Sequence, residues 1–367
     1  MSNRVQLTRE ERKGLERVGY DKQQERSGTF LAADDRVLEA KPFSDQMEIM
    51  PVALAIREYD WVHDLLFGLI DPNKDEYTRM VKNQKPLGYF IWVKEGQEVI
   101  LPLQTCFYIR TDQTTQVTHN IIVAEPGSTL HLISGCVADA HVDEARHVGV
   151  TEYYIGEGAT VTTTMIHSWG PNVTVYPRAA AHVKKGARFI SNYVVMSPVK
   201  NIQMAPEAVV EEGGLAEFYS IVYAPEGSSL DIGGKIRLKG EQARSEIVSR
   251  VVSDGGKVIT RGCIVGEVDG VQGTMACNGL LVDPRGSIHA IPELEGKSPL
   301  VLLSHEASVG MISQDELSYL MASGLSEERA RELIIQGFLE IRIKGLPEVL
   351  HKTIAEMIKK AKAGEAV

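Results

Sequence analysis

The stretch Gly127-Ser-Thr-Leu-His-Leu-Ile133 recurs in altered form along the middle of the chain. Each copy begins with a glycine turn and continues into apolar, β-branched or hydroxyl-bearing residues typical of a strand. The other copies are Gly158-Ala-Thr-Val-Thr-Thr-Thr164, Gly186-Ala-Arg-Phe-Ile-Ser-Asn192, Gly214-Leu-Ala-Glu-Phe-Tyr219, Gly227-Ser-Ser-Leu-Asp-Ile232 and Gly255-Gly-Lys-Val-Ile-Thr260. Their spacing is about 28 residues or roughly half that, a period typical of stacked coils.

This repeat predicts a mostly β protein whose core, residues 89–303, is a β-helix, or solenoid. Each rung would bury its inward side chains against its neighbours, and β-branched residues suit such layers. An antiparallel sandwich or barrel with regular turns is the alternative, because the turn residues alone do not distinguish the two.

The region before this core is expected to be mixed and partly helical, and the region after it helical. In residues 1–88, Thr8 precedes acidic residues as an N-cap would, and residues 51–70 carry apolar side chains at near-helical spacing. Residues 27–46 have no clear period and are interpreted as a loop.

Residues 304–367 contain three predicted helices. Ser313 and Glu316 form a capping-box pattern for the first helix, and Gly324 ends it. A second helix begins after Ser326, and Pro347 starts a third over residues 348–362. The apolar residues that we expect these helices to offer to a partner are Leu317, Leu320, Leu333, Ile334 and Phe338.

Composition excludes several functions. The chain has 367 residues and a net charge of −10 without a basic block, so neither nucleic acid nor an anionic membrane is an expected partner. Its charged N-terminus is unlike a signal peptide, and the apolar run at residues 65–70 is too short to span a bilayer. Four cysteines without a CxxC pair predict reduced thiols in the cytoplasm.

Groups that bind metals occur where the strands give way to helices. Cys277 and the pair His305-Glu306 supply a thiol, an imidazole and a carboxylate. A buried cysteine is by default a small apolar residue, and the histidine would otherwise be a surface residue at a strand end. The segment from Asp139 to His147 is also rich in such groups, but it follows a strand and is interpreted as a solvated turn.

Common enzyme signatures are missing from the sequence. Gly296-Lys297-Ser298 resembles the end of a phosphate-binding loop, but Ile291 stands where that loop needs a glycine. A polysaccharide-active β-helix enzyme is a further alternative. The low aromatic content, 6%, and the predicted lack of a signal peptide argue against it.

The segment from Ser304 to Phe338 resembles the C-terminal signature of the SufB/SufD family, the scaffold subunits of SUF iron–sulfur cluster assembly. The resemblance spans roughly residues 85–345. It includes Ile133-Ser-Gly-Cys136, His167-Ser-Trp169 and Cys277-Asn-Gly-Leu-Leu281. It implies a right-handed parallel β-helix with helical N- and C-terminal regions.

The resemblance also implies a function without catalysis by this chain. Two such subunits pair and build a transient cluster at their interface, and the C-terminal helices dock SufC, an ABC-type ATPase. Cys277, His305 and Glu306 match the interface residues. Cys136 matches a cysteine that takes sulfur from a donor protein, and Trp169 matches a residue lining the sulfur route. The resemblance therefore implies a sulfur relay of Cys136, His167 and Trp169.

Departures from the family pattern suggest a homodimer, with a pair formed with a SufB/SufD paralogue as the alternative. SufB-type chains read CDSLL where this chain has Cys277-Asn-Gly, and SufD-type chains read SHGATVG where it has Ser304-His-Glu. His167 stands where SufB usually has glutamine, and Tyr108 where it has arginine. One chain would therefore do both jobs, unless it is a SufD-like structural subunit that carries no cluster.

Overall fold

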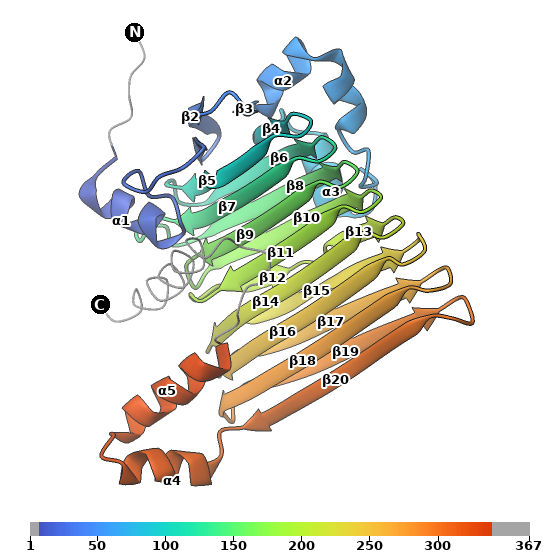
Figure 1. Ribbon diagram of the computed structural model, residues 1–367. Helices are drawn as coiled ribbons and strands as arrows, with labels where there is room; N and C mark the ends of the chain where they lie inside the picture. The colour runs from blue at the N-terminus through green and yellow to red at the C-terminus, as the bar shows by residue number, and fades with distance from the viewer. Residues whose placement is uncertain (1–6, 340–367) are drawn as a thin grey trace.

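The computed structural model describes residues 7–339 and contains a parallel β-solenoid of about 8 turns (Figure 1). Every pairing between named strands from β5 onward is parallel, which confirms the predicted solenoid and excludes the antiparallel alternative. Only β1 with β2 and β3 with β4 pair antiparallel, at the N-terminal end.

Two sheets form the walls of the solenoid. The first sheet runs in the order β2 (Arg36–Pro42), β1 (Gly28–Ala33), β5 (Glu98–Ile109), β7 (Thr129–Ala138), β9 (Thr160–Ser168), β11 (Arg188–Val195), β14 (Leu215–Pro225), β16 (Arg244–Asp254), β18 (Gln272–Asp283) and β20 (Leu302–Met311). The second runs in the order β3 (Met47–Pro51), β4 (Tyr89–Val93), β6 (Thr114–Ala124), β8 (Ala145–Ile155), β10 (Val173–Val183), β12 (Asn201–Gln203) with β13 (Glu207–Val210), β15 (Ser229–Leu238), β17 (Lys257–Gly266) and β19 (Ser287–Gly296).

Glycine turns give the repeat its spacing. Gly158 and Gly186 have φ of +66° and +65°, a left-handed conformation that favours glycine, and the strands β9 and β11 begin two residues later. Thr160 pairs with Arg188, so these neighbouring rungs of the first sheet are 188 − 160 = 28 residues apart. The sequence period is therefore one turn of the solenoid.

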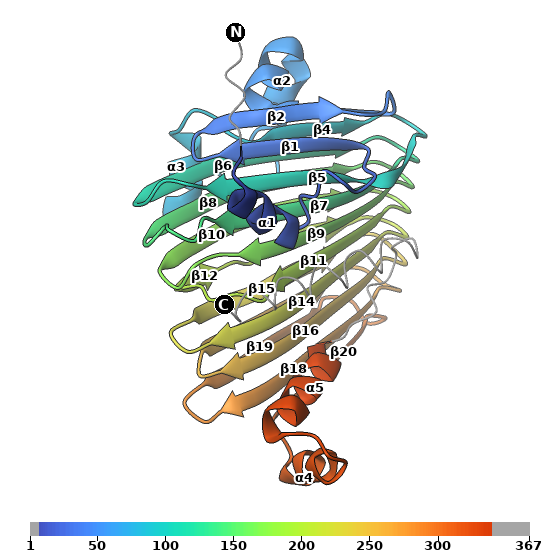
Figure 2. The same cartoon turned by 90° about the vertical axis from the view of Figure 1, so that its left-hand side faces the viewer.

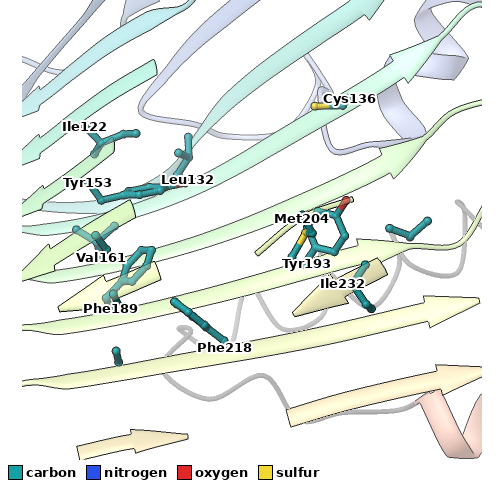
Figure 3. Packing of buried hydrophobic residues seen from close by; sticks show 14 of the residues in the cluster. Ile122, Leu132, Cys136, Tyr153, Val161, Phe189, Tyr193, Met204, Phe218 and Ile232 are labelled. Carbon is teal, nitrogen blue, oxygen red and sulfur yellow. The ribbon is translucent and has the colours of Figure 1, made fainter. Parts of the chain in front are cut away.

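Side chains alternate between a packed interior and two covered outer faces. The interior holds one continuous apolar cluster from Phe30 to Cys277 (Figure 3). The outer face of the first sheet packs against α1 (Arg9–Arg17) near β7 and α5 (Glu327–Leu339) near β16 (Figure 2). The outer face of the second sheet packs under α2 (Val52–Glu58), a 3-10 helix (Asp60–Leu65) and α3 (Glu76–Lys82).

The N-terminal region is helical where predicted but also contributes strands. The Thr8 hydroxyl accepts from the Glu11 amide, and the Glu11 side chain accepts from the Thr8 amide, which confirms the predicted cap. The loop predicted over residues 27–46 is wrong, because β1 and β2 lie there. All six residues of β1 are buried, so the strand lacks the alternation that would reveal it.

The last strand extends further than the predicted boundary at residue 303. Strand β20 runs to Met311, and α4 (Gln314–Ala322) follows it. Residues 304–311 therefore belong to the solenoid, held by in-register pairing with β18. The Ser313 hydroxyl caps α4 and Gly324 follows it with φ +94°, as predicted. The third predicted helix lies outside the described residues. Within residues 7–339, no helix is long and apolar enough to cross a bilayer.

Candidate functional site

Cys277 lies near the C-terminal end of the solenoid and faces its interior. It is 1% exposed and belongs to the interior cluster together with Met275, two residues earlier on β18. Burial raises the pKa of its thiol, and the Thr260 side chain offsets part of that effect. The thiol is therefore protonated at neutral pH until a metal or another electrophile displaces the proton.

His305 faces the same side of the sheet as Cys277, and Glu306 faces the opposite side. His305 pairs with Met275 in the parallel register, and Glu306 pairs with Ala276. In-register neighbours point the same way and successive residues alternate, so the interior side receives the imidazole and the thiol. The Nε2 atom of His305 is buried and has no hydrogen-bond partner among the described residues.

The end of the solenoid beside this pair is uncovered. Strands β19 and β20 are the last in their sheets, and no described strand pairs with their outer edges. Large apolar side chains are exposed on β20, where Leu302 is 65%, Val309 45% and Met311 59% exposed. An exposed, apolar edge strand is a template for pairing with another chain.

Cys136 lies inside the solenoid on β7, five strands of the first sheet before Cys277 on β18. Cys136 pairs in register with His167 of β9. The Nδ1 atom of His167 accepts a hydrogen bond from the Trp169 indole at 2.9 Å and lies 3.2 Å from the Tyr193 hydroxyl. The structure thus brings the three predicted relay residues Cys136, His167 and Trp169 together.

Cys136, His147, His167, Trp169 and Tyr193 form an interior group, and burial keeps its titratable side chains uncharged. Burial lowers the pKa of His167 to about 3 and that of His147 to about 4, and it raises the pKa of Cys136 to about 12. Because Nδ1 of His167 accepts, its Nε2 atom carries the proton, and this buried N–H has no partner. A neutral N–H donor therefore lies beside the thiol.

Two members of this group were missed by the sequence prediction. His147 is not in a solvated turn but on β8, buried beside the Trp169 ring at 5.3 Å between centroids. Tyr193 is buried on β11. Strand alternation was the available signal for His147: it stands two residues after the start of a strand whose odd-numbered residues point inward.

Three small cavities follow one another inside the solenoid. The first, about 20 Å³, is lined by Cys136, His147 and His167. The second, about 60 Å³, shares Thr151, Met165 and Pro177 with the first. The third, about 10 Å³, shares Ser191, Tyr193, Met204 and Pro206 with the second. It is also lined by Ser249, the register neighbour of Cys277.

Some of the predicted docking residues on the C-terminal helices are packed against the protein, and others are exposed to solvent. Leu317 is buried and Leu320 is half-buried, whereas Leu333 is 37% exposed. Ile334 and Phe338 are half-buried against the outer face of the first sheet. Tyr319 and Met321 are exposed on α4 and were missed by the sequence prediction. The exposed apolar residues of these helices are therefore Tyr319, Met321 and Leu333.

We expect the stability of the protein to fall between pH 6.5 and pH 4 because of His147 and His167. The unfolded chain protonates these imidazoles below about pH 6.5, but the folded chain does so only near their lowered pKa values. Between these pH values the unfolded state binds more protons than the folded state. Each imidazole therefore lowers the free energy of unfolding by up to about 1.4 kcal/mol for every unit by which the pH falls. Urea titrations of wild type and His147→Gln across this range measure the effect. If the free energy of unfolding of the variant depended on pH as steeply as that of wild type, the predicted role of His147 would be refuted.

Comparison with known proteins gives the family of this chain. The fold and the two sites define a β-solenoid protein with thiols and imidazoles in its interior and at one uncovered end. Residues 107–338 match the family described as "SUF system FeS cluster assembly, SufBD core domain". The chain belongs to the SufBD family.

Curated relatives that match most of this chain carry the same family name. A protein named "Iron-sulfur cluster assembly SufBD family protein" from Archaeoglobus fulgidus is 41% identical over 348 residues, covering 95% of this chain and 94% of the relative. One from Methanothermobacter thermautotrophicus is 38% identical over 360 residues, covering 96% and 88%. One from Pyrococcus horikoshii is 33% identical, covering 86% and 71%.

Proposed function

We propose that this protein is a scaffold on which a transient iron–sulfur cluster is built at the interface of two copies of the chain. The observation that carries the proposal is the pair Cys277 and His305, which share the interior side of adjacent strands at the uncovered end of a SufBD solenoid. Thiolate and imidazole are ligands of iron–sulfur chemistry. The cluster is the product and leaves, so a mixed ligand set is favourable.

A second copy of the chain would complete the ligand set. Within residues 7–339, no group of three His, Cys, Asp or Glu side chains lies close enough together to hold a metal ion. A two-fold axis at the uncovered end would double the thiol and the imidazole. Glu306, on the outer face of β20, would then act across the interface, toward the partner copy.

We expect a dimer in solution, held by the edge strand β20. Val309→Lys should produce a monomer, because it places a charge at an exposed apolar position of that edge. Light scattering at micromolar concentration measures the mass, and Lys257→Met, at an exposed position of β17, is the control. A wild-type protein that is a monodisperse monomer would refute the dimer.

The interior group would pass sulfur toward the assembly site. Cys136 would take the terminal sulfur of a persulfide on a donor protein, breaking the donor's S–S bond and releasing the donor as its thiol. The unpartnered Nε2–H of His167 would donate a hydrogen bond to the resulting perthiolate. Trp169 and Tyr193 orient the ring by contacting Nδ1. The three cavities between Cys136 and the neighbour of Cys277 support such a route.

ATP hydrolysis would come from a partner, an ABC-type ATPase of the SufC kind. The sequence carries no phosphate loop, and the helices α4 and α5 expose Tyr319, Met321 and Leu333 at the same end of the solenoid as β20 (Figure 2). Movement of these helices by the ATPase would open or close the dimer interface. Free thiols at all four cysteines fit a reducing compartment such as the cytoplasm.

The proposed function is tested by anaerobic co-purification with the ATPase followed by iron and sulfide analysis. We expect the complex to retain both elements after reconstitution. A complex that forms without iron or sulfide would identify a SufD-like structural subunit instead. The variant Tyr319→Ala/Leu333→Ala should lose the ATPase while leaving the dimer intact.

A further inference from the structure

The wall of the solenoid is interrupted at one place in the second sheet. Strand β12 ends at Gln203 and β13 begins at Glu207, so Met204, Ala205 and Pro206 replace a continuous strand between β10 and β15. Pro206 and the neighbouring Pro177 of β10 have no N–H with which to continue the ladder. The gap therefore follows from the sequence on both strands.

The interruption coincides with the largest of the three interior cavities. This cavity, about 60 Å³, is lined by inward-facing residues, including Met165 and Tyr193, and also by Arg178, Ala180 and Glu207. Those last three residues belong to the outward-facing alternate positions of β10 and β13. The lining of this cavity thus includes residues from both faces of the wall at the interruption. Figure 3 shows Met204 beside Tyr193 at this position.

The outer rim is closed by ion pairs from the N-terminal region. Arg178 donates from Nε to Asp75 at 2.6 Å and from Nη1 to the Gln203 carbonyl at 2.8 Å, which satisfies an oxygen next to the interruption. Lys74 pairs with Glu207. Both charged rim residues are therefore neutralised by the segment that precedes α3.

We propose that this interruption is a lateral port through which hydrogen sulfide enters the solenoid, an inference that rests on the proposed function. The inward lining carries no charge and presents the thioethers of Met165 and Met204 with the rings of Tyr153, Phe189 and Tyr193. Such a surface rejects ions and suits a small neutral sulfur compound. A volume of about 60 Å³ holds only a few molecules of the size of water.

Hydrogen sulfide fits the chemistry as well as the space. Its sulfur is already at the oxidation level of sulfide, so it binds ferrous iron by releasing two protons to water, and neither an oxidant nor a reductant is needed. The port opens between the cavity of Cys136 and the cavity that reaches Ser249 beside Cys277. Cys277 faces inward and is the register neighbour of Ser249, so sulfide in that cavity would lie one rung from it.

The port is tested by the reactivity of Cys136 with methylmercury chloride, a small linear neutral probe, followed residue by residue with mass spectrometry. Cys106 is the internal control. It is as buried as Cys136 but lies in the outer cluster, away from the cavities, so its labelling reports unfolding. We expect Cys136 to react faster than Cys106, and 4-(chloromercuri)benzenesulfonate, which is bulky and charged, to react slowly with both.

Two variants change the port in opposite directions. Ser191→Leu fills the cavity and should slow labelling of Cys136 about tenfold, an increase of about 1.4 kcal/mol in the barrier. Met165→Ala widens the neck to the Cys136 cavity and should accelerate it. Ser229→Leu, the same change at an exposed position, is the matched control. Equal labelling of Cys136 and Cys106 in all variants would overturn the port.

A second readout identifies the substrate. With ferrous iron and free sulfide, Ser191→Leu should form cluster more slowly than Ser229→Leu but reach the same final amount. An unchanged rate, combined with slowed labelling, would overturn hydrogen sulfide as the substrate while leaving the port in place. No cluster in wild type would refute the proposed function, whereas the labelling result would still decide on the port.

Discussion

Replacing Cys277 with serine is expected to reduce the iron and sulfide retained after anaerobic reconstitution to background. Cys277 is the only cysteine on β18, and its sulfur is the soft ligand of the proposed pair with His305. A serine hydroxyl binds iron much more weakly than thiolate does. Visible absorption and chemical analysis of iron and sulfide measure the loss.

The other cysteines provide matched controls for this experiment. Cys263 lies on β17, the strand before β18 in the chain but in the second sheet, at an outward-facing position beside Glu293. Cys263→Ser should therefore retain the cluster. His305→Ala should weaken retention by a smaller margin than Cys277→Ser, since imidazole is the weaker ligand. Absorption like that of wild type in Cys277→Ser would remove this cysteine from the site.

Replacing Glu152 is expected to cause the largest loss of stability. Its carboxylate is completely buried and accepts from the backbone amides of Phe67 at 2.8 Å, Leu69 at 2.7 Å and Ile70 at 3.2 Å. It also accepts from Nε2 of His119 at 2.7 Å. These bonds attach the N-terminal region to the outer face of β8 and hold Phe67 at a φ of +57°.

Glu152→Gln keeps the shape of the side chain but replaces one acceptor oxygen with a donor. Several charge-assisted bonds are lost and donors are left without partners, so we expect destabilisation of about 3 kcal/mol. Urea unfolding followed by circular dichroism measures it. Glu157→Gln, an exposed position in a turn, should change stability by less than about 0.5 kcal/mol. Equal midpoints for both variants would show that Glu152 does not anchor this region.

The solenoid could be predicted from sequence because its turns repeat. A glycine with positive φ precedes a strand by two residues at Gly127, Gly158 and Gly186, so the period of the turns is visible in the sequence. Strand β1 was missed for the opposite reason. It is buried on both faces and pairs with β5 about 75 residues later, a contact that no local pattern encodes.

The candidate site was only partly predictable. The sequence singled out Cys277, His305 and Glu306 as residue types that bind metals, and Cys136, His167 and Trp169 through the family resemblance. It did not indicate that Glu306 faces away from the other two, or that His147 joins Cys136 in the interior. The face to which a side chain points depends on where its strand begins. An error of one residue in that boundary moves every side chain to the opposite face of the sheet.

The sequence by itself determined the class of fold, the identity of the reactive groups and the family, because turn chemistry and residue type are local properties. Only the tertiary structure decided which of these groups share a space. Stacking of rungs about 30 residues apart brought Cys136 beside His167 and Cys277 beside β20, and it aligned two prolines into a gap in the wall. Which residues become neighbours depends on the register between strands that are distant in the sequence. That pairing is stabilised by the burial of apolar side chains in the shared interior.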